Sequence, residues 1–402
     1  MGGSGGRGRR GRVVRLPGSL PAGGRMPAFY FIHFFGVGVT LPFLNIYFDA
    51  VGMKGIQLGL LNAVPRLAVG VAPPLLGALA DKFRRGRDIL LLGAALSMAA
   101  ALAMWGREGF WPLLILVTLY SAARGSLVPI AENVCLREIA QSGAQYGRVR
   151  LWGSLGFIAA ALGVGALVDA VSIGAMFPVL AGSSLLLMGV IVVFPREGGE
   201  ARRRFRGDLL ELLGNHPYMI LLWTSTLVAF SAGPFSIYFS IYLKELGHPA
   251  WVIGMAWTAG VASEIFFFVY AQALQRRVGV KAMITAGMLA CALRWEMVTW
   301  TESGVLLVAI QTLHGVGFGV FHAASIQYVD RLSGPATKNT AQSLYSSAEI
   351  GLGVTAGGLL ASWLLPTWGF LALLHIGALL SLAGAAWFAL ALGLRNEEGS
   401  GG

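Results

Sequence analysis

The chain has 402 residues, of which 56% are hydrophobic and 12% are charged, and its mean hydropathy is +0.69. No soluble globular domain of this size has such a composition, which excludes soluble classes of protein. The net charge of +11 is spread over short segments rather than gathered in a basic domain, so orientation in an anionic membrane explains it better than nucleic-acid binding. Two cysteines, Cys135 and Cys291, are too few for a disulfide framework or a metal cluster.

The chain begins with a segment rich in Gly, Arg and Pro, and residues 1–27 are predicted to be a disordered basic tail. Whether the Gly/Ser stretches at the two ends are native is left open by the sequence. The first apolar run, 28–48, follows positive charge as the core of a signal peptide would. It is too long for such a core, and the sequence therefore predicts an uncleaved first helix.

Apolar runs of membrane-spanning length follow one another along the chain. A bilayer core of about 30 Å requires about 20 apolar helical residues. The twelve predicted spans are 28–48, 56–79, 88–105, 110–134, 147–169, 173–194, 217–243, 250–274, 282–300, 304–329, 340–363 and 369–394. The predicted fold is an all-α integral membrane protein in two pseudo-symmetric six-helix bundles, 28–194 and 217–394. A cytoplasmic linker, 195–216, joins them, and a short cytoplasmic tail, 395–402, follows.

The gaps between the runs alternate in positive charge. Taken in order, the odd-numbered gaps contain only Lys54, Arg107 and Lys244 as cations, whereas the even-numbered gaps and the two ends hold most of the others. Cytoplasmic loops retain Lys and Arg, so both termini are expected in the cytoplasm.

Two loops at matching positions in the halves are related. The segment GALADKFRRGR (77–87) joins spans two and three, and AQALQRRVGVK (271–281) joins spans eight and nine, which is typical of a parallel repeat. The first resembles the signature loop of the major facilitator superfamily, although the second lacks its aspartate. The resemblance implies a gating role for Gly77, Asp81, Arg85 and Arg87. A simple turn with a basic rim is the alternative.

Ionisable residues inside the spans are costly and usually mark a site, a pathway or an ion pair. They are Arg66, Arg124, Glu132, Arg150, Glu264, Arg294, Glu296, His314, His322 and Glu349. The four arginines balance the four glutamates, which mutual neutralisation across a shared polar cavity would require. A structural ion pair or a side chain reaching the interface is the alternative for any single residue. His33 and His375 fit satisfied core histidines better.

A narrower resemblance lies in spans five and ten. The runs YGRVRLWGS (146–154) and LHGVGFGVFHAA (313–324) resemble the phenylpropionate permease branch of the superfamily, and more distantly its nucleoside and lactose:proton symporters. Matched by residue, this implies substrate binding by Glu132 with Arg150 and by Arg294 with His314. Gln311 and Gly317 replace a lysine and the proton-coupling glutamate of the lactose group. Proton coupling is therefore expected at Glu264, Glu349 or His314.

The expected function is secondary transport by alternating access, driven by proton symport. Four inward arginines suit a carboxylate substrate. Aromatic residues nearby would either stack on a ring or simply pack; they are Tyr120, Trp152, Phe157 and Phe318. Sugar or nucleoside symport and proton-coupled efflux remain alternatives. The substrate contacts predicted for the first half are Arg66, Arg124, Glu132 and Arg150.

Other classes of protein find little support. There is no HExxH motif, no GxSxG elbow and no clustered His/Asp set, so an enzyme is not expected. No cofactor, metal or nucleic-acid partner is predicted. The chain is expected to be a monomer in the bacterial inner membrane, with a small molecule and protons as its partners.

Overall fold

The computed structural model describes residues 24–83, 85–142, 145–195, 209–334 and 337–393, and within these ranges the chain is helical without strands. The predicted tails 1–27 and 395–402, and the linker 195–216, lie wholly or largely outside the described residues. Their predicted disorder and the domain boundaries built on them stay predictions.

The first half contains the six spans predicted from hydropathy, each close to its expected limits. One of them is divided at Ser126 into two helices. The elements are α1 (Arg25–Ala50), α2 (Gly55–Phe83), α3 (Gly86–Met104), α4 (Phe110–Gly125), α5 (Leu127–Ser142), α6 (Tyr146–Ala170), η1 (Ile173–Ala175) and α7 (Met176–Val192).

The second half is more irregular, because several of its spans change helical type along their length. Its elements are α8 (Leu209–Gly214), α9 (His216–Ser231), α10 (Gly233–Glu245), α11 (Ala250–Val278), α12 (Val280–Val298), α13 (Gly304–Ile310), η2 (Gln311–Leu313), η3 (Gly315–Val320), α14 (Phe321–Leu332), α15 (Lys338–Ser346), η4 (Ser347–Val354) and α16 (Thr355–Leu392). Both η3 and η4 are π-helical.

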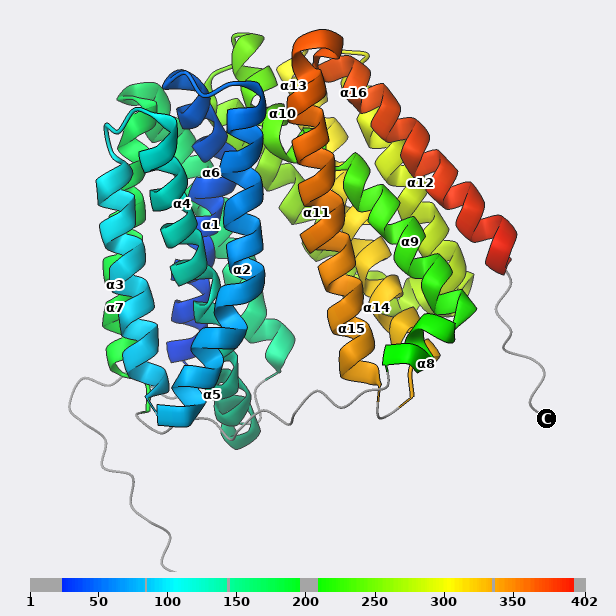
Figure 1. The fold of residues 1–402 in the computed structure, drawn as a ribbon, viewed down its shortest axis with the longest axis horizontal. Coiled ribbons are helices and arrows are strands. Elements are labelled where there is room, and N and C mark those ends of the chain that lie inside the picture. Colours follow the sequence, from blue (N-terminus) through cyan, green and yellow to red (C-terminus); the bar gives the residue numbers. More distant parts are fainter. Residues whose placement is uncertain (1–23, 84, 143–144, 196–208, 335–336, 394–402) are drawn as a thin grey trace, which may run out of the picture.

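Length and hydropathy identify ten membrane-spanning helices in the described residues. The longest, Thr340–Leu392, is two spans, since Gly369 has a φ of 74° and the chain turns back there (Figure 1). Glycine adopts this left-handed conformation without steric cost. The remaining span is α12, whose hydropathy is lowered by Lys281, Arg294 and Glu296. The prediction of an all-α, twelve-span membrane fold is thus confirmed.

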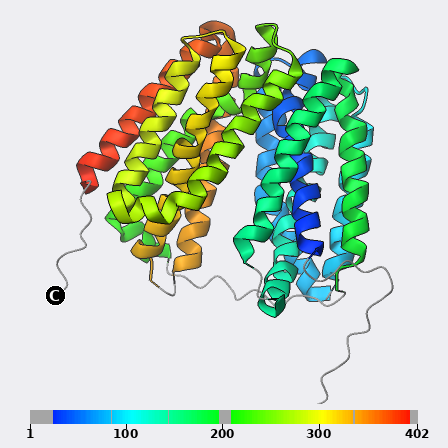
Figure 2. The same ribbon diagram turned by 180° about the vertical axis from the view of Figure 1, so that it is seen from behind.

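Figures 1 and 2 show α1–α7 gathered in one bundle and α9–α16 in the other. The bundles meet at one end and diverge toward the end that holds α5 and α8. The main contacts between them pair α6 with α11 and α2 with α16. The end where they meet holds the loop at 51–54 and the loop at 246–249, which are cation-poor gaps of the sequence.

Glycines bring the two bundles into backbone contact at this closed end. A Cβ on Gly254 of α11 would lie 2.1 Å from the carbonyl oxygen of Ala161 in α6, and one on Gly165 would lie 2.8 Å from that of Ala250. On the α2–α16 side, a Cβ on Gly59 would lie 2.7 Å from Ser362. Small residues permit such close approach of membrane helices. Larger side chains at these glycines would hold the bundles apart.

Asp169, at the end of α6, ties the closed end together. Its carboxylate accepts hydrogen bonds from the backbone N–H groups of Ala250 at 2.7 Å and Trp251 at 2.8 Å. The first N–H groups of a helix have no partner within it, and an aspartate commonly supplies one. Here the cap of α11 comes from the other bundle, so it stabilises the association of the two halves as well as the helix.

Replacing Asp169 with Ala should loosen this end. Loss of an N-cap costs about 0.5–2 kcal/mol, and one or two kcal/mol corresponds to a factor of about 5–30 in an equilibrium. Amide hydrogen exchange at Ala250 and Trp251 should rise by a similar factor. Asp169→Asn keeps an acceptor oxygen and serves as the control. Unchanged exchange in the alanine variant would show that the cap does not hold the halves together.

Replacing Gly254 with Val should shift the protein toward a form that is open at this end. Overpacking of a close contact costs roughly 1–3 kcal/mol, which separation of the halves would relieve. Spin labels on Lys54→Cys and Ser303→Cys, one in each half, should move apart in electron-spin distance measurements. Gly163→Val, where a Cβ meets nothing within 4 Å, is the matched control. An identical distance distribution in both variants would contradict the prediction.

Candidate functional site

A cavity of about 810 Å³ lies between the two bundles, bounded by α1, α2, α4, α10 and η4. Leu and Val side chains form much of its wall. Its polar lining consists of Thr40, Asn45, Asn62, Arg66, Tyr120, Ser121, Ser236, Ser346 and Ser347. We call it the central cavity. It combines apolar walls with neutral hydroxyl and amide groups and one cation.

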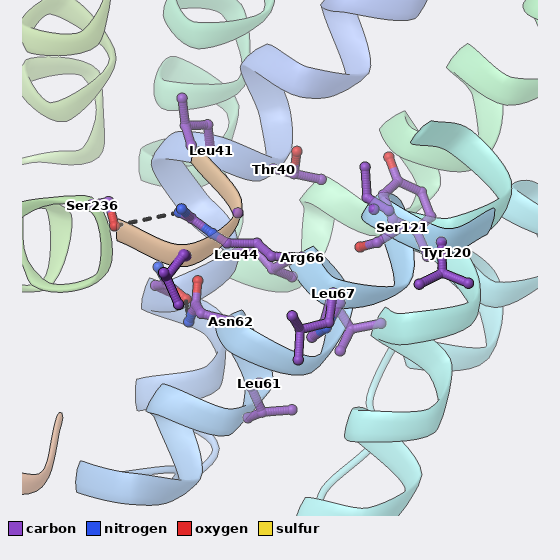
Figure 3. Close-up of a pocket in the computed structure, with 18 of the residues that line it drawn as sticks. Thr40, Leu41, Leu44, Leu61, Asn62, Arg66, Leu67, Tyr120, Ser121 and Ser236 are labelled. Carbon is purple, nitrogen blue, oxygen red and sulfur yellow. Dashed lines mark hydrogen bonds between the residues drawn. The ribbon is translucent and has the colours of Figure 1, made fainter. Parts of the chain in front are cut away.

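Arg66 reaches across the central cavity from α2 toward the second half (Figure 3). Its Nη2 donates to Ser236 Oγ of α10 at 3.4 Å. One turn away on α2, Asn62 Nδ2 donates to Asn45 Oδ1 of α1 at 2.8 Å. No carboxylate is among the described residues that line the cavity. The guanidinium therefore has donor groups to offer a solute.

A second polar group lies in the first half, on α1, α5 and α6. The hydroxyl of Tyr146 donates to the carboxylate of Glu132. The guanidinium of Arg150 lies 4.0 Å from the centre of the Phe34 ring and 5.5 Å from that of Tyr30. Cation–π contacts of this kind stabilise a cation away from water.

Its counterpart in the second half is centred on Arg294, which is only 7% exposed. Arg294 donates to Gln311 Oε1 at 2.8 Å and 2.5 Å, and to His314 Nδ1 at 3.0 Å. Because arginine only donates, His314 Nδ1 must carry a lone pair. Its Nε2 then faces Glu264, whose carboxylate oxygen lies 3.8 Å away.

These two polar groups meet across the gap between the bundles. Arg150 of α6 lies close enough to Glu264 of α11 to interact with it electrostatically. A line of polar side chains therefore runs from one half to the other, and we call it the interface cluster: Glu132, Tyr146, Arg150, Glu264, His314 and Arg294. The four residues matched to known symporters by resemblance lie in it. Their substrate-binding roles stay predictions.

Arg124, in contrast, does not face the space between the bundles. It is 3% exposed and donates to Ser184 Oγ at 3.0 Å and to the carbonyl oxygens of Ile32 and His33 at 3.0 Å and 2.9 Å. A Cβ on Gly36 would lie 2.2 Å from its guanidinium. The expectation that Arg124 contacts substrate is therefore corrected: it fastens α1 to α4 and α7 inside the first half.

The predicted gating loop lies between α2 and α3, at the end where the bundles diverge. Arg87 Nη1 donates to the carbonyl oxygen of Val192 at 3.2 Å, and Arg85 is exposed. A Cβ on Gly77 would meet nothing within 4 Å. The side chain of Asp81 lies outside the described residues, and the gating role of this loop stays a prediction.

Two departures from the lactose permease pattern have local explanations. Gln311, where a lysine was expected, accepts both hydrogen bonds from Arg294 and so satisfies a buried cation without adding a second one. At Gly317, a Cβ would lie 2.9 Å from Cys291 Sγ, and that thiol donates to the Gly317 carbonyl oxygen at 3.2 Å. A glutamate at this position would displace Cys291.

Three ionisable groups of the spans lie away from the centre: Glu296, His375 and His33. His375 Nδ1 is 2.8 Å from Glu296 Oε2, and the His375 side chain is 50% exposed. The expectation that His375 is a core histidine is therefore corrected, since its partner is a carboxylate in a partly exposed pair. His33 is buried and stacks on Phe29, as expected of a core histidine.

The neutral groups in the central cavity could not be predicted from the sequence. Asn45, Ser236, Ser346 and Ser347 line it, yet serine is ordinary in membrane helices, where its hydroxyl can bond to the preceding turn. Ser236 does this with Gly233. Only the spacing of Asn62 and Arg66, four residues apart on one helix face, was a usable signal.

Comparison with known proteins agrees with this architecture. The chain matches the MFS_1 like family over residues 24–391. It belongs to the major facilitator superfamily. It is 31% identical over 349 residues to the maltose permease of Geobacillus stearothermophilus, covering 85% of this chain and 87% of the permease. It is 26% identical to the probable 3-phenylpropionic acid transporter of Escherichia coli, covering 80% and 86% of the two chains.

Among solved structures, the nucleoside transporter NupG superposes with a TM-score of 0.82 at 17% identity, over 94% of this chain and 100% of NupG. At that identity the likeness concerns the fold. Together with the family assignment, the finding identifies this major facilitator as a membrane transporter rather than an enzyme.

Replacing Arg124 with Leu should destabilise the protein without altering the central cavity. A hydrogen bond to a charged group is worth about 1.5–3 kcal/mol, and the variant loses those to Ser184, Ile32 and His33. The thermal unfolding midpoint should fall clearly below that of the control Arg85→Leu, which removes an exposed cation. Equal midpoints for the two variants would show that Arg124 is not a structural tie.

Proposed function

We propose that this transporter carries a small, hydroxyl-rich organic solute across the bacterial cytoplasmic membrane together with protons, acting as a monomer. The observation that carries the proposal is the lining of the central cavity, in which hydroxyl and amide groups from both bundles surround one arginine. Such groups exchange hydrogen bonds with the hydroxyls of a sugar, while the Leu and Val walls pack on its less polar faces. The maltose permease relative supports sugars as the first class to examine.

The expected orientation makes the structure an inward-open form. Because the cation-rich gaps are predicted to be cytoplasmic, both termini lie inside the cell. The bundles then meet at the outer end, through the Asp169 cap and the glycine contacts, and diverge toward the cytoplasm. Alternating access would exchange this closed outer end for a closed inner one.

Fewer arginines line the central cavity than the sequence predicted, which weakens the expectation of a carboxylate substrate. Of the four arginines predicted to face inward, Arg66 lines the central cavity and Arg124 is structural. Arg150 lies over the Phe34 ring, and Arg294 is held by Gln311. A carboxylate nevertheless remains the second candidate. Arg66 has no carboxylate partner in the cavity, and its guanidinium could bind a solute carboxylate bidentately. The phenylpropionic acid transporter relative supports it.

The coupling proton would be carried by Glu264, Glu349 or His314. Glu264 and His314 face each other in the interface cluster, and Glu349 lies beside the cavity on η4. Uptake of a proton by any of these groups would change the charge held at the centre of the protein, and with it the energy of the neighbouring charged groups. That differential energy is what a two-state carrier needs.

The Arg66 variants separate the two substrate classes. Thermal-shift screening of the purified protein against sugars, nucleosides and organic acids would first identify a ligand class by its stabilisation of the folded state. For a carboxylate, Arg66→Gln should weaken binding by roughly 10- to 100-fold, since a charge-assisted hydrogen bond is worth about 1.5–3 kcal/mol. For a neutral sugar, the glutamine should retain most of the affinity.

The control is Arg107→Gln, which removes an exposed cation at the closed end. Radiolabelled flux in vesicles of known orientation then distinguishes uptake from the alternative of proton-coupled efflux. Absence of any gradient-dependent flux of sugars, nucleosides or acids in the unmodified protein would overturn the proposal.

A further inference from the structure

A buried polar group that the substrate site does not use lies behind η4 in the second half. It consists of Ser225 on α9, His322 and Ser325 on α14, Tyr345 on α15 and Glu349 on η4, and we call it the Glu349 cluster. The two serines and the tyrosine are fully buried, and Glu349 is only 5% exposed. The hydroxyl of Tyr345 lies near Ser225, Ser325 and Glu349.

The polar atoms of the Glu349 cluster lie close to one another, but few of them meet in a hydrogen bond of standard geometry. Within the described part of the chain, no such bond is formed by the hydroxyls of Ser225, Ser325 and Tyr345, by Glu349 Oε2 or by His322 Nδ1, although the Tyr345 hydroxyl lies within hydrogen-bonding reach of Ser225, Ser325 and Glu349. Glu349 Oε2 and His322 Nδ1 are 3.8 Å apart, which is near enough for an ion pair and too far for a hydrogen bond. A small adjustment would bond these groups to one another, so the cluster can exchange hydrogen bonds when one of its members gains a proton.

The surrounding charges leave His322 as the nearest basic partner of Glu349 among the described residues. Arg294 of α12 is engaged by Gln311 and His314, while Cys291, on the same helix, lies near Glu349. Glu264 of α11 interacts electrostatically with His322 and pairs with His314. Glu349 therefore has His322 and the Tyr345 hydroxyl as its neighbours, and a proton is the smallest species that removes its charge.

The backbone links this cluster to the central cavity. Glu349 lies in η4, a π-helical segment of eight residues. Ser347, Gly351 and Leu352 of the same segment, with Ser346 just before it, line the cavity. One short segment thus has the buried carboxylate on one side and the cavity wall on another. π-helical turns are rare and frequently occur at functional sites.

A second π-helical segment supports His322. In η3, Phe318 stacks between His314 and His322, with ring centres 5.2 Å apart on each side and interplanar angles of 7° and 10°. This stack fixes His322 against Glu349 and ties it to His314 of the interface cluster. The two π-helical segments therefore hold the imidazole and the carboxylate of one pair.

We propose that the Glu349 cluster binds the coupling proton, and that η4 transmits its protonation to the cavity wall. This assignment rests on the proposed proton-coupled transport. A proton from the aqueous side adds to the Glu349 carboxylate and gives a neutral carboxylic acid, whose O–H then donates to a neighbouring hydroxyl. Loss of the ion pair releases η4 from His322 and alters the wall formed by Ser347 and Gly351.

Infrared spectroscopy of the full-length protein tests proton binding without a substrate. Protonation of Glu349 should give a carboxylic acid C=O band that grows as the pH falls and shifts in D₂O. The band should be lost in Glu349→Gln and displaced in His322→Gln. The control is Glu296→Gln, which removes a carboxylate of the partly exposed Glu296–His375 pair and should leave the band intact. Retention of the full band in Glu349→Gln would overturn the assignment.

Transport in proteoliposomes tests coupling, with radiolabelled maltose as the probe, or with the strongest ligand of the thermal-shift screen if maltose gives no flux. Glu349→Gln should retain equilibrium exchange and lose accumulation driven by a proton gradient, whereas Glu296→Gln should retain both. Accumulation equal to that of the unmodified protein would refute the role of Glu349 while leaving proton symport intact.

Other outcomes separate this inference from the function on which it rests. If the unmodified protein shows exchange but no response to a proton gradient, proton coupling itself fails. If a sodium gradient drives accumulation and Glu349→Gln abolishes it, the cluster binds Na⁺ and the proton assignment is overturned. Loss of exchange in Glu349→Gln with a normal thermal unfolding midpoint would place Glu349 in solute binding and also contradict the proposal.

Discussion

The cost of placing charged groups in a bilayer determines where nearly every informative residue of this protein lies. Such groups are expensive in lipid, so they turn inward and pair with one another or with backbone carbonyls. Arg124 is satisfied by carbonyl oxygens inside one bundle, and Arg294 by Gln311 inside the other. Arg66, Arg150 and Glu264 lie where the bundles face each other. The interface between the halves is thus a place where charge compensation is incomplete, as the proposed solute site requires.

Much of the fold followed from the sequence, because the bilayer imposes a simple rule on span length. The apolar runs predicted the helices, including α12, whose three charged residues lower its hydropathy. It was harder to predict which way the side chains of a helix face. Arg66 and Arg124 are both arginines inside apolar runs of the sequence. Arg66 lines the central cavity, whereas Arg124 hydrogen-bonds to the backbone of α1. Packing against neighbouring helices decides this, and a single sequence does not record it.

The neutral part of the site was the least predictable. A serine that lines the cavity, such as Ser236, is indistinguishable in sequence from one buried between helices, such as Ser184. The π-helical segments also left no clear signal, since η3 and η4 are rich in glycine like much of the chain. A π-turn contains one more residue than an α-helical turn, and tertiary contacts must stabilise it. Here these contacts are the stacking of Phe318 and the burial of Glu349.

A coupled carrier requires a wall that contacts the solute and a group that binds the coupling ion. In the proposed mechanism both lie on η4, on different faces of that segment. The closed end depends on backbone contacts and on the Asp169 cap, which are independent of protonation at the centre. The centre, in contrast, contains ionisable pairs that span α11, η3, α14 and η4. Glu264 also interacts with Arg150 of α6, so a change of charge there can act across the two halves. Because η4 is both a wall of the central cavity and the support of Glu349, the proposed protonation of Glu349 would reach the solute without a long pathway.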